Sequence, residues 1–427
     1  MERYREYKNS GVYYIPQIPS EWNVLKGKIL FKQEKRPVNK EDEIVTCFRD
    51  GEVTLRKNRR LEGFTNSLKE IGYQGIRKGD LVIHNMDAFA GAIGVSDSDG
   101  KGTPVYAVCT PIREDANQFY YCYLLRFLAK TGFIQSLAKG IRERSTDFRY
   151  GDFKELLLPV PSRAEQDAIV RYLDSATSEI DKAIAMQQKM IDLLNERKQI
   201  IIQNAVTKGL DENVEMKESG VEWIGSIPKH WEVRKIKTVA NFNPLPQRKF
   251  QQDEIVGYLP MERLGLGSMN PSEISYGKMP VGLNYIEDGD VVIAKVTPCF
   301  ENGKIAIAKN LKNGCAFGTS EIYVYRPIKI DSVFLLYSLQ NEQLKNKCAS
   351  TMMGTGGLKR VNASFAKNVY ITFPPTEKEQ NEIGLFLENK ISTFNKTIEN
   401  IQRQITLLQE RKQIIINEVV TGKVRVI

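Results

Sequence analysis

The chain repeats itself at an interval of about half its length, and this repeat constrains its fold more than any other feature. Residues 10–22 return as 219–231, at an offset of 209 residues. Residues 193–202 return as 407–416, at an offset of 214 residues. Between these matched ends the two halves share little. The sequence therefore predicts one fold used twice, with two different contact surfaces.

Two segments have the pattern of long helices. Apolar or small residues recur mostly in steps of three and four over 165–205 and over 379–419. The first series is Ile169, Leu173, Ala176, Ile180, Ala183, Met190, Leu194 and Ile201. Such a narrow apolar seam is typical of a coiled coil. Ser162 and Thr376 each stand three residues before a glutamate, which is the spacing of a capping box at a helix start.

One seam alone would be compatible with homodimerisation, or with packing of a long helix on its own domain. Two matching seams in one chain favour an intramolecular pair, which is antiparallel if a pseudo-twofold axis relates the halves. We therefore expect an α+β fold. Two similar globular α/β domains are separated by two long helices that form an antiparallel intramolecular coiled coil. The expected segments are 1–160, 161–208, 209–375 and 376–427.

Both globular parts mix strands and helices. Residues 79–83 and 289–293 each read as a Gly-Asp turn followed by a buried strand. Further strands are predicted near 44–49, 104–109, 255–259, 304–309 and 320–326. Helical stretches are predicted near 118–138 and 331–348.

Catalytic and metal-binding motifs were not found. The six cysteines form no Cys-x-x-Cys pair, which favours reduced, partly buried thiols, and two histidines make a zinc site improbable. The glycine-rich segment 354–359 lacks the Gly-Lys-Ser/Thr of a P-loop, and 265–267 lacks the third glycine of a dinucleotide loop. Residues 373–376 lack the amide or acid and the aromatic residue of an amino-methyltransferase loop.

No apolar run approaches the roughly 18 residues of a membrane helix, and the N-terminus has no secretory signal. These features predict a cytoplasmic protein without a membrane partner.

Basic clusters point to a polyanionic partner. The formal net charge is +9, and no acid occurs from 233 to 252 or from 343 to 376. Lysine and arginine neutralise phosphates, although a single cluster is more often a solvated face. The predicted DNA-binding residues are Arg56, Lys57, Arg59, Arg60, Arg142, Arg144, Lys295, Lys359, Arg360 and Lys367.

These motifs together resemble the specificity subunits of type I restriction–modification systems. The resemblance is carried by Ser-Gly-Val-x-x-Ile-x-x-Ile-Pro-x-x-Trp (219–231, looser at 10–22), by 289–304, by Pro-x-x-x-Glu-Gln at 161–166 and 375–380, and by the Glu-Arg-Lys-Gln-Ile-Ile-Ile helix ends. It covers essentially the whole chain. Residues 80–95 lack the Lys-Val-Thr-Pro-Cys-Phe run of 295–300, so the first domain is expected in a different recognition subgroup.

The resemblance implies a non-catalytic chain with two target recognition domains, each reading one half of a split double-stranded DNA site. It implies that the helices set the gap and dock two modification (adenine methyltransferase) subunits, with restriction (nuclease-translocase) subunits completing the enzyme. No cofactor is expected on this chain. S-adenosylmethionine, ATP and Mg are expected on the partner subunits.

Two other classes remain open at this point. The first is a self-contained methyltransferase-like enzyme, which S-adenosylmethionine binding by the isolated chain would reveal. The second is a coiled-coil scaffold without a nucleic-acid role, which a mobility shift with random duplex would test.

Overall fold

The structure is a computed structural model that describes residues 2–59, 71–137, 147–355 and 357–426. Its contacts divide the chain into two compact units. Unit 1 contains residues 1–187 and 403–427, and unit 2 contains residues 188–402.

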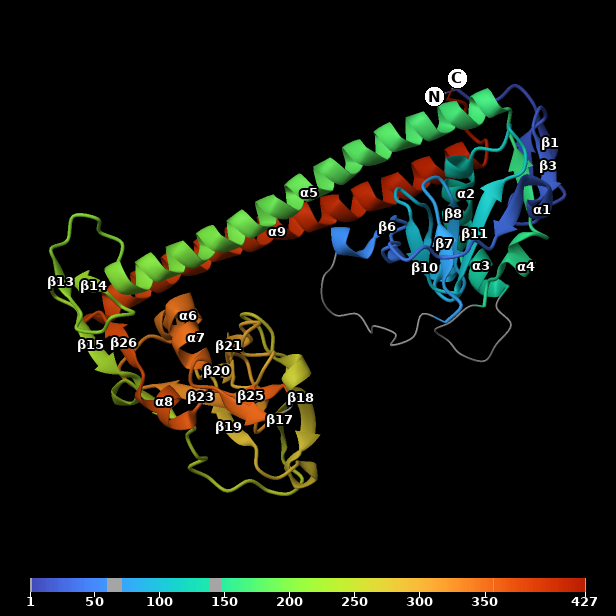
Figure 1. Cartoon of the computed structure of the whole chain (residues 1–427). Helices are drawn as coiled ribbons and strands as arrows, with labels where there is room; N and C mark the ends of the chain where they lie inside the picture. Colours follow the sequence, from blue (N-terminus) through green and yellow to red (C-terminus); the bar gives the residue numbers. More distant parts are fainter. Residues whose placement is uncertain (1, 60–70, 138–146, 356, 427) are drawn as a thin grey trace. The chain divides into compact units, whose positions relative to one another are not determined.

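Unit 1 is built around an antiparallel four-stranded sheet of order β4-β11-β8-β9 (Figure 1). In β8 (Leu81–His84), the first three side chains are fully buried, as the apolar run of the sequence predicts. The other strands are β1 (Tyr7–Asn9), β2 (Gln17–Pro19), β3 (Asn23–Lys26), β4 (Phe31–Glu34), β5 (Val45–Cys47), β6 (Val53–Leu55), β7 (Gln74–Ile76), β9 (Ile93–Val95), β10 (Gly100–Gly102), β11 (Tyr106–Pro111) and β12 (Leu157–Val160). The short helices are α1 (Gly27–Leu30), α2 (Gln118–Lys130), α3 (Phe133–Ser136) and α4 (Tyr150–Phe153).

Unit 2 contains a sheet with the corresponding order, β16-β23-β20-β21, and a second four-stranded sheet, β18-β17-β22-β19, in which β17 and β22 are parallel. Its strands are β13 (Met216–Glu218), β14 (Ser226–Pro228), β15 (Glu232–Lys235), β16 (Ala240–Phe242), β17 (Ile255–Leu259), β18 (Ser272–Ser275), β19 (Asn284–Glu287), β20 (Val291–Ala294), β21 (Ile305–Ile307), β22 (Cys315–Gly318), β23 (Ile322–Pro327), β24 (Met353–Thr355), β25 (Leu358–Arg360) and β26 (Tyr370–Phe373). The short helices are α6 (Ser332–Gln340), α7 (Glu342–Ala349) and α8 (Ala363–Asn368).

The two long helices that the sequence predicts are confirmed as α5 (Arg163–Lys208) and α9 (Glu377–Val420). At their starts, the hydroxyls of Ser162 and Thr376 each accept a hydrogen bond of 3.3 Å from the backbone N–H three residues on. Past their ends, Gly209 and Gly422 have φ angles of 76° and 73°, a left-handed conformation that favours glycine.

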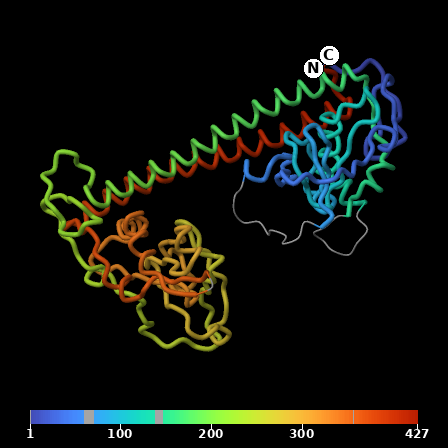
Figure 2. Tube along the Cα trace, in the orientation of Figure 1, coloured from blue at the N-terminus to red at the C-terminus, as the bar shows by residue number. Residues whose placement is uncertain are grey.

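Within each unit, the α5 and α9 segments run in opposite directions. In unit 1, Asp181 accepts from Lys412 at 2.6 Å, and Gln187 donates to Gln404 at 3.1 Å, so one residue number rises while the other falls. In unit 2, Lys198 donates to Asn395 at 3.0 Å, whereas Gly209 at the end of α5 lies near Glu379 at the start of α9. Figure 2 shows the two segments side by side in each unit.

One predicted seam residue was wrong. Met190 is 51% exposed, and its neighbour Ile191, 5% exposed, takes the buried place. The seam keeps its three-and-four spacing only if the polar residues Gln187 and Lys198 are included, and Lys198 is 7% exposed. The sequence reading took Gln187 and Arg197 as the polar interruptions of the seam, whereas the structure places Gln187 and Lys198 there, with Ile191 between them.

The Glu-Gln pairs of the Pro-x-x-x-Glu-Gln motif tie each long helix to its own globular part. Gln166 is fully buried, accepts a 2.8 Å hydrogen bond from the N–H of Asn117, and donates to Pro161 O at 2.9 Å. Asn117 is the N-cap residue of α2. Gln380 likewise accepts from the N–H of Asp331, the N-cap residue of α6, at 2.7 Å, and donates to Pro374 O at 2.9 Å.

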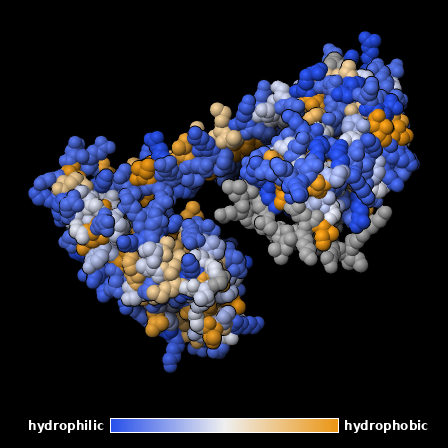
Figure 3. Space-filling view, viewed as in Figure 1, coloured by the Kyte–Doolittle hydropathy of each residue, from blue (hydrophilic) through white to orange (hydrophobic). Residues whose placement is uncertain are grey.

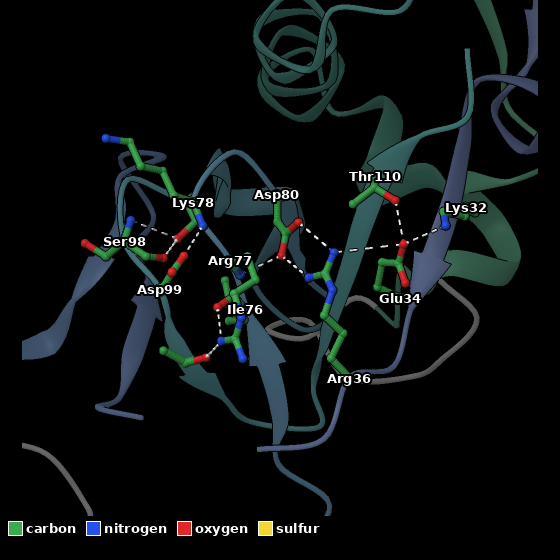
Figure 4. A network of polar contacts seen from close by, with 12 residues as sticks. Lys32, Glu34, Arg36, Ile76, Arg77, Lys78, Asp80, Ser98, Asp99 and Thr110 are labelled. Carbon is green, nitrogen blue, oxygen red and sulfur yellow. Dashed lines mark hydrogen bonds and ion pairs between the residues drawn. The ribbon is translucent and has the colours of Figure 1, made fainter. Parts of the chain in front are cut away.

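The two Gly-Asp turns carry buried carboxylates. Asp80 is paired with the guanidinium of Arg36, which follows β4, and also accepts from Arg77 N (Figure 4). Asp290 is paired with Arg326 of β23 through two hydrogen bonds of 2.9 Å, and accepts from Glu287 N at 2.8 Å. The carboxylates occupy matching places, but Arg36 comes from the segment after β4 and Arg326 from β23. Burying a charge without such a partner would be costly.

Candidate nucleic-acid interface

The first predicted cluster lies after β6, where η1 spans Arg56–Asn58. Lys57 forms an ion pair with Glu43. Arg59 bonds Asp50 at 2.7 Å and Glu52 at 3.0 Å, and its guanidinium lies 4.2 Å from the ring centroid of Phe48. These carboxylates offset part of the positive charge.

Of the other four residues predicted in the first half of the chain, only Arg56 lies among the described residues. Arg56 donates to the hydroxyl of Thr46 at 3.3 Å. Arg60, Arg142 and Arg144 lie outside the described residues.

A polar cleft of about 1000 Å³ opens in unit 1 beside the central sheet. It is lined by side chains from separate segments, among them Gln33, Lys35, Arg36, Tyr73, Gln74 and Arg149. The guanidinium of Arg36 is held by Asp80, and Arg149 bonds Asp147 at 2.6 Å. Sequence reasoning missed this cleft because its residues are scattered over more than 100 positions and form no local cluster.

In unit 2 the structure brings three predicted residues together. The backbone C=O of Lys295 accepts from Val361 N at 2.9 Å, directly beside Lys359 and Arg360. The Lys295 ammonium lies 5.1 Å from the ring centroid of Tyr323. Arg360 forms three hydrogen bonds of 3.2, 2.8 and 2.7 Å with Glu321, and this arginine lowers the pKa of the Glu321 carboxyl. Lys367 lies exposed on a different element, α8.

Lys359 belongs to a hairpin that the sequence analysis did not identify. The glycine-rich segment that lacks the P-loop signature contributes residues to the paired strands β24 and β25. All six strand residues are exposed. The available signal was the pair of glycines between two short non-acidic runs, which is typical of a tight turn.

The outer surface of the helices carries exposed apolar residues at repeated positions. Leu193 and Ile200 of α5 are each 51% exposed, and Leu407 and Ile414 of α9 are 57% and 55% exposed. Both pairs are seven residues apart, so each lies on one helix face. In unit 2, Met190, Leu193, Leu194, Arg197, Ile200 and Ile201 line a shallow hollow of about 680 Å³. Elsewhere, the face seen in Figure 3 is mostly hydrophilic with scattered apolar residues.

The described residues hold no sign of a metal site or of a membrane-spanning helix. No group of three or more His, Cys, Asp and Glu side chains could hold a metal ion there. All six cysteines are free thiols, and four of them are buried. In the same part of the chain, none of the helices combines the length and the apolar character needed to span a bilayer.

The family of the second half is shown by comparison with known proteins. Residues 228–407 match the type I restriction modification DNA specificity domain, and this segment belongs to that family. The resemblance deduced from the sequence motifs is thereby confirmed.

Curated relatives have corresponding names. The Escherichia coli type I restriction enzyme EcoEI specificity subunit is 31% identical over 194 residues, which are 44% of this chain and 32% of that protein. The match thus spans about a third of the length of that relative. The putative type I restriction enzyme MjaX specificity subunit of Methanocaldococcus jannaschii is 24% identical over 437 residues, with 96% of each chain covered.

Two solved structures share the fold. One chain, from a study of complex assembly and conformational transition of the type I R-M system, has a TM-score of 0.69 at 15% identity and covers 95% of this chain and 99% of its own. The HsdS subunit from Thermoanaerobacter tengcongensis has a TM-score of 0.51 at 16% identity, covering 95% and 98%. At these identities the likeness concerns the fold.

Proposed function

We propose that this chain is the sequence-specific DNA-recognition subunit of a type I restriction–modification complex, and that each unit reads one half of a bipartite site. The observation that carries this proposal is the specificity-domain match over 228–407. It is combined with a central sheet in unit 1 whose strand order corresponds to that of unit 2.

Equivalent side-chain contacts in the two units support a pseudo-twofold repeat. Asp181 and Asn395 are 214 residues apart, and so are their partners Lys412 and Lys198. The buried glutamines 166 and 380, and the N-cap residues 117 and 331 that they hold, have the same offset of 214. Such contacts, repeated at a constant offset in residue number, are expected when two copies of one fold each contribute a helix to an antiparallel intramolecular coiled coil.

The differing parts support two different recognition surfaces. Unit 2 has a second four-stranded sheet and the β24–β25 hairpin, whereas the corresponding strands of unit 1 form the two-stranded pairs β5–β6 and β7–β10. Two units with matching central sheets and different additional strands suit a protein that reads two unlike half-sites. On this proposal the helices, which continue from one unit into the other, set the length of the unread gap.

The helix surface supports docking of two copies of one partner. Leu193 and Ile200 correspond to Leu407 and Ile414 under the offset of 214. Equivalent apolar patches are expected to bind equivalent surfaces. We assign them to two adenine methyltransferase subunits, with restriction subunits joining the assembly. S-adenosylmethionine, ATP and Mg would be bound by those partners, and this chain would be non-catalytic.

The proposal is tested by methyl transfer with the full chain and its methyltransferase partner, followed by methylome sequencing of a host that expresses both. We expect one bipartite motif, methylated only when both proteins are present. Robust methyl transfer by the purified chain alone would contradict its non-catalytic role. Methylation without any sequence motif would contradict its role in recognition.

A further inference from the structure

The β24–β25 hairpin of unit 2 is fixed at one edge, and no third strand among the described residues pairs with the other edge. The Thr297 hydroxyl accepts from Lys359 N at 2.9 Å and donates to Gly357 O at 2.8 Å, and Thr297 N donates to Lys359 O at 2.9 Å. The Arg360–Glu321 pair adds a second attachment. Strand β25 is therefore held between Thr297 and β24, and β24 forms the outer edge.

The hairpin has two unlike faces. Met353 pairs with Arg360 and Thr355 with Leu358, so these four side chains point to one side, while Lys359 points to the other. Its cross-strand neighbour is Gly354, which has no side chain to cover the ammonium. A Cβ at Gly354 would approach Leu358 O to 2.1 Å, so the hairpin requires glycine there.

The apolar side chains of the first face are exposed to water. Met353 is 69% exposed and Leu358 is 54% exposed, although both stand on an ordered, anchored ribbon. Contiguous exposed apolar side chains of this kind commonly mark a contact surface.

The positive charge of the residues around the hairpin favours nucleic acid as its binding partner. The stretch from 343 to 376 contains no acid and includes Lys345, Lys347, Lys359, Arg360 and Lys367. The nearby Glu321 carboxylate is already engaged by Arg360. A two-stranded ribbon fits the major groove of B-DNA, about 12 Å wide, and apolar side chains there contact the thymine methyl group.

We propose that the β24–β25 hairpin enters the major groove of the half-site read by unit 2, where Leu358, flanked by Met353, recognises a thymine methyl group and Lys359 contacts a phosphate. This inference rests on the proposed function. It predicts that the methyl group of one thymine in that half-site contributes to binding.

The test uses the full chain with its methyltransferase subunits and duplexes carrying the motif found by methylome sequencing. Each thymine of the two half-sites is replaced in turn by deoxyuridine, which lacks only the methyl group. At one position in the half-site of unit 2 we expect about fourfold weaker binding, the factor for one buried methyl group. The Leu358→Ala variant should bind the thymine and uracil duplexes equally.

Matched variants separate this role from others. Val281→Ala changes another apolar residue of unit 2, 97% exposed but outside the hairpin, and should keep the wild-type preference for thymine. Lys359→Ala should weaken binding to all duplexes alike. Thermal unfolding should not change in either hairpin variant, since both side chains are exposed.

Two results would overturn the hairpin inference while leaving the motif, and thus the proposed function, intact. They are indifference of the wild type to every uracil in that half-site and an unchanged thymine preference in Leu358→Ala. The first result would favour insertion of Leu358 as a wedge into the minor groove. A chain that directs no motif at all would instead contradict the proposed function.

Discussion

Lys198 of α5 is almost completely buried, yet its ammonium bonds a neutral amide, Asn395 of α9, at 3.0 Å. The repeat places an aspartate at the equivalent position in unit 1, where Asp181 pairs with Lys412. Unit 2 therefore holds a buried cation without the carboxylate that its counterpart has. An amide satisfies one hydrogen bond but supplies no charge, so burial lowers the pKa of Lys198.

Replacing Asn395 by aspartate should stabilise unit 2. The new carboxylate would offset the desolvation of the Lys198 ammonium, and we expect a gain of about 1 kcal/mol in the free energy of unfolding. Chemical denaturation of the full chain measures this gain. The matched control is Asp181→Asn, which should destabilise unit 1 by about 0.5 kcal/mol, since that pair is more exposed. A destabilised Asn395→Asp variant would contradict this account.

The pH dependence of the free energy of unfolding should reflect the lowered pKa of Lys198. Because the folded chain has a Lys198 pKa below the ordinary value of 10.5, the unfolded chain binds more protons between the lowered pKa and that value. Stability from this group should therefore rise as the pH climbs through that window. Asn395→Asp raises the folded pKa and should flatten the rise. Denaturation midpoints across alkaline pH, compared between wild type and variant, provide the measurement.

The salt dependence of DNA binding should identify the cations that meet phosphates. The double variant Lys359→Ala, Lys367→Ala should flatten the slope of log K against log salt by roughly 0.9 per lost phosphate contact. Lys378→Ala removes an exposed cation that pairs with Glu382 on α9, and should leave the slope unchanged. Equal slopes for the double variant and the wild type would assign Lys359 and Lys367 to a solvated face.

The length of the paired helices should set the gap between half-sites. Inserting seven residues into α5 after Lys189 and seven into α9 after Arg403 preserves the three-and-four seam on both helices. Each insertion adds about 10 Å of helix, close to three base pairs at about 3.4 Å each. Methylome sequencing should then show unchanged half-sites with a gap about three base pairs longer.

The control for this insertion changes one helix alone. Seven residues in α5 without the matching insertion shift the seam on one side only, so we expect loss of stability and of methylation. An active double-insertion variant with the original gap would show that the helices dock partners without setting the distance.

The long helices were predictable because a seam leaves a periodic signal in the sequence, and their bounds agree within a few residues with the pattern from 165 to 205 and from 379 to 419. The choice of Met190 failed for a physical reason. Gln187 and Lys198 occupy seam positions because their polar ends find partners, Gln404 and Asn395, on the facing helix. Polarity alone does not reveal a partner more than 190 residues away.

For the candidate DNA-binding surface of unit 2, the sequence predicted the amino-acid composition but not the contacts of the individual side chains. The absence of acids from 343 to 376 marked the region, but the sequence did not show that Arg360 is engaged by Glu321 while Lys359 stands opposite a glycine. Those differences depend on strand register and on a partner 39 residues away. The arginines that pair with Asp80 and Asp290 were equally hard to predict, because the two matching carboxylates draw their partners from different segments of the chain.

Unit 1 is completed by residues from both ends of the chain. Arg425 N donates to Glu2 O at 2.9 Å, Tyr120 donates to Val420 O at 3.0 Å, and Val419 and Val420 are fully buried in its core. Unit 2, by contrast, is one continuous stretch. During synthesis on the ribosome, residues 1–187 therefore emerge first but must wait for 403–427, while the later-made unit has its whole core available sooner. The part of the protein translated first is the part whose core is completed last.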